Sequence, residues 1–189
     1  TRILWLIFSL QVKTNKPVII AVTGSIGKTS TVNSILEILG RDNCVGGAGY
    51  NTEIGVPLIV NNLKTPKNTL NIFSWLIIFY KMLTNESINN KKYWVLEIGI
   101  DKPGEMDFYT KRISADVVVI TGVTGVHLEK FKSVNIILKE KWKLASICKN
   151  ILIINTDFKI LADKAIEEHS SGRLRENINL IGYGTNSDE

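Results

Sequence analysis

With 189 residues, 44% of them hydrophobic and 22% charged, the chain has the composition of a globular domain that folds without disulfides or structural metals. Its two cysteines, Cys44 and Cys148, lie far apart in the sequence, which argues against a disulfide framework and fits the reducing cytoplasm. The net charge of +5 comes from scattered lysines and not from a basic run, so it gives no sign of nucleic-acid binding, and an anionic small-molecule substrate explains it equally well.

Two apolar stretches raise the question of a membrane. Residues 3–10 and 70–83 are both shorter than the roughly 20 apolar residues that a spanning helix needs, and Lys81 interrupts the second. No secretory signal with a cleavage site is visible. We therefore expect no membrane span, while contact of either stretch with a membrane surface stays open.

The chain divides into a short leader and one domain. Residues 1–16 end in a polar run and are interpreted as a leader segment or as the end of an upstream region. Residues 17–189 are interpreted as a single domain that is incomplete at its C-terminal end. From residue 17 onward, short apolar runs alternate with helical patterns.

These runs predict strands and helices in alternation. Residues 17–23 are continuously apolar, which is typical of a strand covered on both faces. Residues 28–39 place apolar side chains every three or four positions, as on one face of a helix, and Gly40 ends that helix. Further strands are expected at 93–98, 116–121, 151–154 and 179–181, further helices at 133–149 and 159–169, and a loop at 41–55. The pattern predicts an α/β fold, with a mostly parallel sheet and helices on both faces.

The turn between the first strand and the first helix contains a glycine-rich motif, Gly24-Ser25-Ile26-Gly27-Lys28-Thr29-Ser30. Such a loop binds phosphate because successive N–H groups point inward and the helix N-terminus carries partial positive charge. Lys28 would reach the β- and γ-phosphates, and Thr29 would offer its hydroxyl to Mg²⁺. The common P-loop has another glycine where this chain has Val22, so the motif is the shorter G-x-x-G-K-T. The alternative is an ordinary strand-to-helix turn that happens to contain a lysine.

A carboxylate lies at the same edge of the predicted sheet. Glu97 is the one charged residue in the run 93–98 and lies near the end of that strand. Ligands of open α/β sheets gather at the carboxyl ends of the strands, and Mg²⁺ prefers carboxylate and phosphate oxygens. Glu97 is therefore a candidate metal ligand, and the alternative is a glutamate turned toward solvent.

Four stretches, in order along the chain, resemble the Mur ligase family. The phosphate loop, TGSIGKTS at 23–30, is similar to the loop that Mur ligases share with folylpolyglutamate synthases. Residues 51–58 (NTEIGVPL), 97–106 (EIGIDKPGEM) and 127–133 (HLEKFKS) resemble motifs of the MurF branch. The similarity extends over about residues 17–185. It implies a P-loop-containing central ATP-binding domain of a Mur ligase.

The resemblance implies roles that the residue pattern alone leaves open. His127 would contact a second metal, although a lone histidine is more often structural and imidazole is not a preferred ligand of Mg²⁺. Asn51 and Thr52 would lie near the substrate, although such residues also cluster in ordinary turns. The catalytic candidates are Lys28, Glu97, His127 and Lys141. The metal candidates are Thr29, Glu97, His127 and Lys141.

Lys141 falls on the apolar stripe of the predicted helix 133–149, whereas Lys139 and Lys143 lie off it. A buried, unpaired ammonium is costly, so one interpretation is a lysine whose head group reaches back to solvent. The other is a carbamate formed with CO₂, because burial lowers the pKa of lysine and leaves the neutral amine that this reaction requires. In Mur ligases such a lysine follows the motif histidine by fourteen positions, as Lys141 follows His127.

The function implied by the resemblance is ATP-dependent amide bond formation through an acyl phosphate. ATP and two Mg²⁺ ions would be the cofactors, and a UDP-muramoyl peptide and an amino acid or dipeptide the substrates. In the MurF branch, D-alanyl-D-alanine is added to UDP-N-acetylmuramoyl tripeptide during peptidoglycan synthesis, by a cytoplasmic monomer. The alternatives are another Mur-type or folylpolyglutamate-type ligase, a P-loop NTPase switch, and a nucleotide-binding module without turnover. A switch is expected to have an aspartate where Glu97 stands, and an inert module has no need of a buried lysine at 141.

Overall fold

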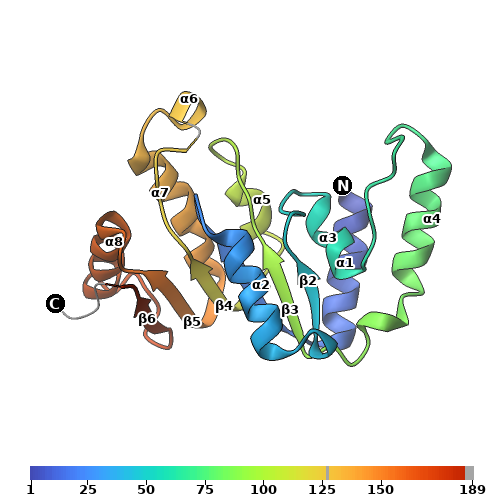
Figure 1. The fold of residues 1–189 in the computed structure, drawn as a ribbon, viewed down its shortest axis with the longest axis horizontal. Helices are drawn as coiled ribbons and strands as arrows, with labels where there is room; N and C mark the ends of the chain where they lie inside the picture. Colours follow the sequence, from blue (N-terminus) through green and yellow to red (C-terminus); the bar gives the residue numbers. More distant parts are fainter. Residues whose placement is uncertain (127, 186–189) are drawn as a thin grey trace.

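A single parallel sheet organises the chain (Figure 1). The computed structural model describes residues 1–126 and 128–185. Six strands lie in the order β2-β3-β1-β4-β5-β6, and each neighbouring pair is parallel. They are β1 (Val18–Thr23), β2 (Cys44–Gly47), β3 (Tyr93–Glu97), β4 (Ala115–Ile120), β5 (Cys148–Asn155) and β6 (Asn179–Tyr183). The predicted α/β class and parallel sheet are confirmed, and the carboxyl ends of β1, β3 and β4 meet at one edge.

Strand β2 is the one strand that the sequence pattern missed, because residues 41–55 were expected to form a loop. Its sequence, Cys-Val-Gly-Gly, has no apolar run to mark it as a strand. A Cβ atom on Gly46 would lie 1.9 Å from the carbonyl oxygen of Val95 in β3. The close approach of β2 to β3, and not local propensity, therefore decides this strand.

Helices cover both faces of the sheet, as predicted (Figure 1). They are α1 (Arg2–Asn15), α2 (Lys28–Leu39), α3 (Gly55–Val60), α4 (Ile72–Leu83), α5 (Met106–Thr110), α6 (Leu128–Phe131), α7 (Val134–Trp142) and α8 (Lys159–Ser170). Short 3-10 helices span Arg41–Asn43, Glu86–Ile88 and Lys143–Ile147. Strand side chains alternate between two cores: Ile20 and Val22 pack with α2, whereas Ile19 and Ala21 face the core shared by α1, α5, α7 and α8.

The helix expected at 133–149 is shorter than predicted. Helix α7 ends at Trp142, a 3-10 helix follows, and Cys148 already pairs with Ala115 in the sheet. The apolar stripe continues past α7 because Ala145 and Cys148 are also buried, but they reach the core from the 3-10 helix and from β5. Burial was therefore predicted correctly there, and helical geometry was not.

The segment interpreted as a leader forms α1 and packs into the domain. Phe8 contacts Trp94 of β3, with ring centroids 5.6 Å apart, and the indole of Trp5 donates to the carbonyl of Glu53 at 2.7 Å. Gln11 is buried against Asn61 through a reciprocal pair of hydrogen bonds. On its other side α1 packs against α4. Within the described part of the chain, no helix is long and apolar enough to cross a membrane.

Candidate nucleotide and metal site

The glycine-rich loop lies between β1 and α2 and is hydrogen-bonded to the residue that follows β4. Gly27 caps α2 with a φ of 79°, a conformation that favours glycine. The hydroxyl of Thr121 lies 2.5 Å from the carbonyl of Ile26, and a Cβ atom on Gly24 would come within 2.0 Å of that hydroxyl. Residue 24 must therefore lack a side chain for the loop to close on β4. Thr121 was not among the site residues predicted from the sequence, because a single polar residue after an apolar strand was all that marked it.

The rest of the loop is held by its neighbours in the same way. The N–H of Ser25 donates to the carbonyl of Gly122 at 2.8 Å, and the Ser25 hydroxyl accepts from the N–H of Thr124 at 3.1 Å. The loop is therefore fixed to the segment after β4 on its inner side, which leaves the N-terminus of α2 to face the cavity. Preformed loops of this kind bind phosphate without a large ordering cost.

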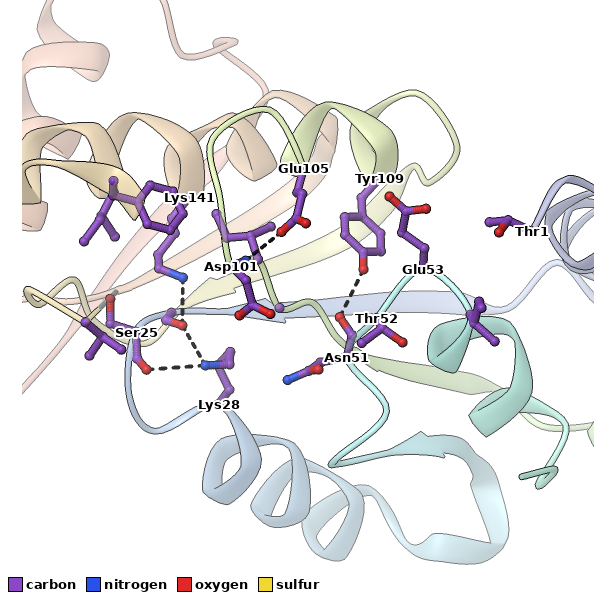
Figure 2. Close-up of a pocket in the computed structure, with 17 residues that line it drawn as sticks. Thr1, Ser25, Lys28, Asn51, Thr52, Glu53, Asp101, Glu105, Tyr109 and Lys141 are labelled. Atoms are coloured by element: carbon purple, nitrogen blue, oxygen red, sulfur yellow. Dashed lines mark hydrogen bonds between the residues drawn. The ribbon is translucent and has the colours of Figure 1, made fainter. Parts of the chain in front are cut away.

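Lys28 folds back over the loop from the first turn of α2. Its ammonium donates to the carbonyls of Gly24 at 2.8 Å and Ser25 at 3.4 Å (Figure 2). Burial lowers the pKa of Lys28, and the nearby carboxylate of Glu97 partly offsets this effect. The side chain thus lies at the phosphate loop, where the sequence motif predicted it.

Lys141 reaches the same loop from α7, at the same end of the cavity as Lys28 (Figure 2). Ser133 caps this helix by accepting from the N–H of Ile136, and the helix buries Ile137 and Leu138 one turn before Lys141. The lysine is only 4% exposed, and its ammonium donates to the carbonyl of Gly24 at 2.9 Å. Burial, together with the charge of Lys28, lowers its pKa to about 8. Lys141 therefore does not reach back to solvent.

Glu97 ends β3 and is held beside the phosphate loop by strand pairing, since Val22 of β1 is its partner in the register. It is 2% exposed. One carboxylate oxygen lies 3.2 Å from the hydroxyl of Thr29 and 3.1 Å from the N–H of Gly49, and the other accepts from the side-chain amide of Asn51 at 3.1 Å. This carboxylate is buried and fully hydrogen-bonded, so it is not turned toward solvent.

The pair of Thr29 and Glu97 fits a magnesium ion bound with nucleotide. Mg²⁺ takes oxygen ligands, and in nucleotide sites it usually keeps several waters and one or two protein groups. Among residues 1–126 and 128–185, no three His, Cys, Asp or Glu side chains lie together as a metal cluster. Thr29 and Glu97 would offer two oxygen ligands, and an ion held there would take its other ligands from phosphate and water. His127 lies outside the described residues, so its predicted role stays a prediction.

Asn51 and Thr52 lie in the loop that follows β2. The carbonyl of Asn51 accepts from the hydroxyl of Tyr109 at 3.0 Å and from the N–H of Gly99 at 2.9 Å. The Thr52 hydroxyl accepts from the N–H of Gly55 at 3.1 Å, at the start of α3. Both residues therefore have the structural contacts that turn residues commonly make, and both also border the cavity.

A cavity of about 360 Å³ joins these residues. Its lining includes Lys28 and Lys141 at one end and Asn51 and Thr52 at the other, and Figure 2 shows them around one opening. Three carboxylates that sequence analysis did not select also line it, from Glu53, Asp101 and Glu105. Tyr109 is a further lining residue, and burial raises its pKa, with the charge of Glu53 adding to the effect. Asp101, Glu105 and Tyr109 lie in or just after the 97–106 motif, so that motif could have indicated them as candidate site residues.

A glycine-rich loop between a buried strand and a helix, with a lysine in the loop and a carboxylate on the next strand, defines a P-loop-type nucleotide-binding α/β domain. The sequence profile of the Mur ligase middle domain matches residues 22–189. The chain therefore belongs to the Mur ligase family, whose members are ATP-dependent ligases. The predicted family is confirmed.

Several curated relatives carry one enzyme name. The chain is 26% identical to UDP-N-acetylmuramoyl-tripeptide--D-alanyl-D-alanine ligase of Borreliella burgdorferi, over 77% of this chain and 27% of that protein. It is 30% identical to the ligase of the same name from Buchnera aphidicola subsp. Acyrthosiphon pisum, over 77% of this chain and 28% of that protein. The chain thus spans little more than a quarter of the length of these relatives.

Solved structures show the same fold. MurF from Acinetobacter baumannii superposes with a TM-score of 0.66 at 22% identity, covering 97% of this chain and 35% of that one. MurF from Thermotoga maritima, solved in complex with ADP, gives 0.65 at 21% identity, over 97% of this chain and 36% of that one. A complex of FPGS with AMPPCP superposes with a TM-score of 0.52 at 17% identity, covering 96% of this chain and 49% of that one.

Proposed function

We propose that the protein containing this domain forms an amide bond at the expense of ATP, through an acyl phosphate. A substrate carboxylate attacks the γ-phosphorus of ATP, ADP leaves, and an amine then displaces phosphate from the acyl group. The observation that carries the proposal is the convergence of Lys28 and Lys141 on the phosphate loop, beside the Thr29–Glu97 pair. Membership of the Mur ligase family supports the same chemistry.

The loop residues 24–30 hold the nucleotide phosphates in this proposal. Their N–H groups and the N-terminus of α2 attract the anion, and Lys28 releases the Gly24 carbonyl to contact the transferring phosphoryl group. Thr29 and Glu97 would hold Mg²⁺, which offsets the charge of the β- and γ-phosphates. Catalysis then consists mainly of positioning and electrostatic stabilisation, as in other phosphoryl transfers.

Lys141 is proposed to act as a carbamate. Its neutral amine attacks CO₂, loses one proton, and becomes an anionic group with two oxygens, which suits a magnesium ligand. Because burial and Lys28 lower its pKa to about 8, the neutral amine is far more available than on a surface lysine. His127 is proposed to contact the same metal, and a second Mg²⁺ follows from these ligands.

The proposed substrates are D-alanyl-D-alanine and UDP-N-acetylmuramoyl tripeptide, in peptidoglycan synthesis. The curated relatives carry that activity in their names, at 26% and 30% identity. The part of the cavity away from the phosphate loop is bordered by Asn51, Thr52 and the carboxylates of Glu53 and Glu105. These groups are proposed to orient the acyl substrate and the incoming amine.

The test uses the full-length protein with ATP, Mg²⁺ and UDP-N-acetylmuramoyl tripeptide. Mass spectrometry of the product and phosphate release are followed with D-alanyl-D-alanine, with single amino acids, and with glutamate plus a folate. A dipeptide-dependent product supports the proposal. Ligation of only a single amino acid, or of glutamate to folate, assigns the protein to another ligase class. ATP hydrolysis that never yields an amide rejects ligation and favours a nucleotide switch.

A further inference from the structure

Helix α4 is apolar on every side, and half of it lies on the surface. Ile78 and Met82 are buried against α1 and α3, as one apolar face of a helix should be. The opposite side is apolar too, with exposed fractions from 55% to 72% for Ile72, Phe73, Leu76, Ile77, Tyr80 and Leu83. Lys81 is the only charged residue in the helix. A helix without a polar face is expected to be covered on all sides, by protein or by lipid.

Helix α1 extends this apolar surface. Ile3, Leu6 and Leu10 recur every three or four residues and are 49% to 62% exposed, while Trp5 and Phe8 on the other side enter the core. Leu10 of α1 and Leu83 of α4 line one groove between the two helices. The two exposed strips therefore meet. We call the nine residues Ile3, Leu6, Leu10, Ile72, Phe73, Leu76, Ile77, Tyr80 and Leu83 the apolar face.

Charge is distributed unevenly along the segments that carry this face, although Glu86, directly after them, lines the groove between the two helices. Residues 1–17 and 54–85 contain six lysines and arginines and no aspartate or glutamate. All six are exposed, and they are Arg2, Lys13, Lys16, Lys64, Lys67 and Lys81. The rest of the chain has 17 basic and 18 acidic residues, since the totals are 23 and 18. The positive excess of the whole chain thus belongs to the segments that carry the apolar face.

We propose that the apolar face docks the protein on the surface of an anionic phospholipid bilayer. Exposed apolar side chains with flanking cations are the features that place a helix in the interface, since the side chains enter the acyl region while lysine and arginine reach the phosphates. Helices α1 and α4, with 14 and 12 residues, suit this peripheral arrangement. No helix in the described part of the chain is long and apolar enough to cross a membrane. A protein partner would need an apolar surface with six matching carboxylates, whereas anionic lipid supplies both properties together.

Docking would bring the nucleotide cavity close to the membrane. Thr1, which caps α1, lines that cavity, and the exposed strip of the same helix belongs to the apolar face. Helix α1 is roughly 21 Å long at 1.5 Å per residue. The cavity therefore opens within about one helix length of the bilayer surface. The docking proposal rests on the apolar face and on the cations of residues 1–17 and 54–85, so it holds or fails independently of the proposed reaction.

The experiment measures binding of the full-length protein to vesicles by flotation, with phosphatidylcholine alone and with phosphatidylcholine containing phosphatidylglycerol. We expect binding only to the anionic vesicles, and loss of it at high salt. Phe73→Ser with Ile77→Ser should abolish it, while Ile38→Ser, at an exposed apolar site on α2, should not. Lys64→Glu with Lys67→Glu should weaken it at least about 25-fold, at about five-fold per cation removed. Lys111→Glu with Lys139→Glu, exposed lysines outside the two segments, should have less effect.

A second measurement separates lipid from other occupants. Phe73→Cys in the full-length protein should react rapidly with a water-soluble maleimide and become protected when anionic vesicles are added. Protection without vesicles means that another part of the protein covers the face, and overturns the proposal. Protection that depends on protein concentration, with a dimer in light scattering, assigns the face to a second copy and also overturns it. Equal binding to neutral and anionic vesicles, or none to either, rejects the anionic surface as the occupant.

Discussion

Lys28 and Lys141 donate hydrogen bonds to one and the same carbonyl oxygen, that of Gly24. They reach it from different helices, α2 and α7, and each is at least partly removed from water. Two ammonium groups around one oxygen repel each other, and this repulsion is part of the reason that the pKa of Lys141 falls to about 8. An anion between the lysines, or conversion of Lys141 to a carbamate, would relieve the repulsion.

Lys28→Ala should abolish ATP-dependent ligation while the fold survives. Its ammonium donates to the loop carbonyls of Gly24 and Ser25 and borders the cavity, so its removal should leave the core intact. Loss of a charge aimed at a transferring phosphoryl group typically lowers kcat by about 10²–10³-fold. Steady-state kinetics and circular dichroism of the full-length variant check this, with Lys102→Ala, an exposed lysine near the cavity, as the control. A correctly folded Lys28→Ala enzyme with near-normal kcat would mean that the loop is only a turn.

Lys141→Ala should lose most activity, and acetate or formate should restore part of it. If Lys141 acts as a carbamate, its function is to supply a metal-binding oxygen, and a small carboxylate can occupy the vacated space and supply that oxygen. Activity is measured with and without added carboxylate in the full-length enzyme, and Lys139→Ala, an exposed lysine of α7, is the matched control.

The outcomes for Lys141 separate three roles. Full activity of the alanine variant contradicts any catalytic role. Loss without rescue by any small carboxylate counts against the carbamate and fits a lysine that acts as a cation. Loss with rescue by carboxylate, but not by chloride at equal ionic strength, supports the carbamate.

The stability of the domain should depend on pH through Lys141. Its folded-state pKa, about 8, lies below the usual 10.5, so the unfolded chain binds more protons between these values and stability rises with pH across that window. Lys141→Met removes this contribution. In CO₂-free buffer, the difference in unfolding free energy between wild type and Lys141→Met should shift in favour of wild type by on the order of 3 kcal/mol from pH 7 to 10.5. Urea unfolding at several pH values measures it, and a constant difference would contradict burial of a titrating amine.

Glu97→Gln should weaken nucleotide binding only when Mg²⁺ is present. The amide keeps the size of the side chain and one acceptor oxygen, so it retains the contact with either Gly49 or Asn51, but it loses the charge that would hold the ion. Calorimetric titration with ATP in Mg²⁺ and in EDTA separates the two effects. Glu105→Gln, at another carboxylate of the same cavity, is the control. Equal losses in Mg²⁺ and EDTA would mean that Glu97 acts through the fold and not through a metal.

The phosphate loop could be predicted from the sequence because every signal for it is local. The apolar run of β1, the glycines at 24 and 27, and the helical spacing of α2 lie within about one strand and one helix of each other. Glu97 could be predicted for the same reason, because it is a single carboxylate at the end of an apolar run. Such patterns depend on backbone sterics and on burial periodicity, which act over a few residues.

Contacts between distant segments were decided only by the tertiary structure. The sequence placed Lys141 on an apolar stripe and left open whether its ammonium reaches solvent. It could not show that Lys141 meets the carbonyl of Gly24, because that contact depends on where α7 crosses the sheet edge. The same is true of Thr121 beneath the loop, and of β2, whose glycines gain strand geometry only by pairing with β3. The exposed side of α4 could not be predicted for a related reason, since an apolar sequence does not say which of its faces will be covered. Local pattern indicates which segments are apolar or helical, whereas the packing of those segments, with strand order and register, determines which faces are covered and which residues touch.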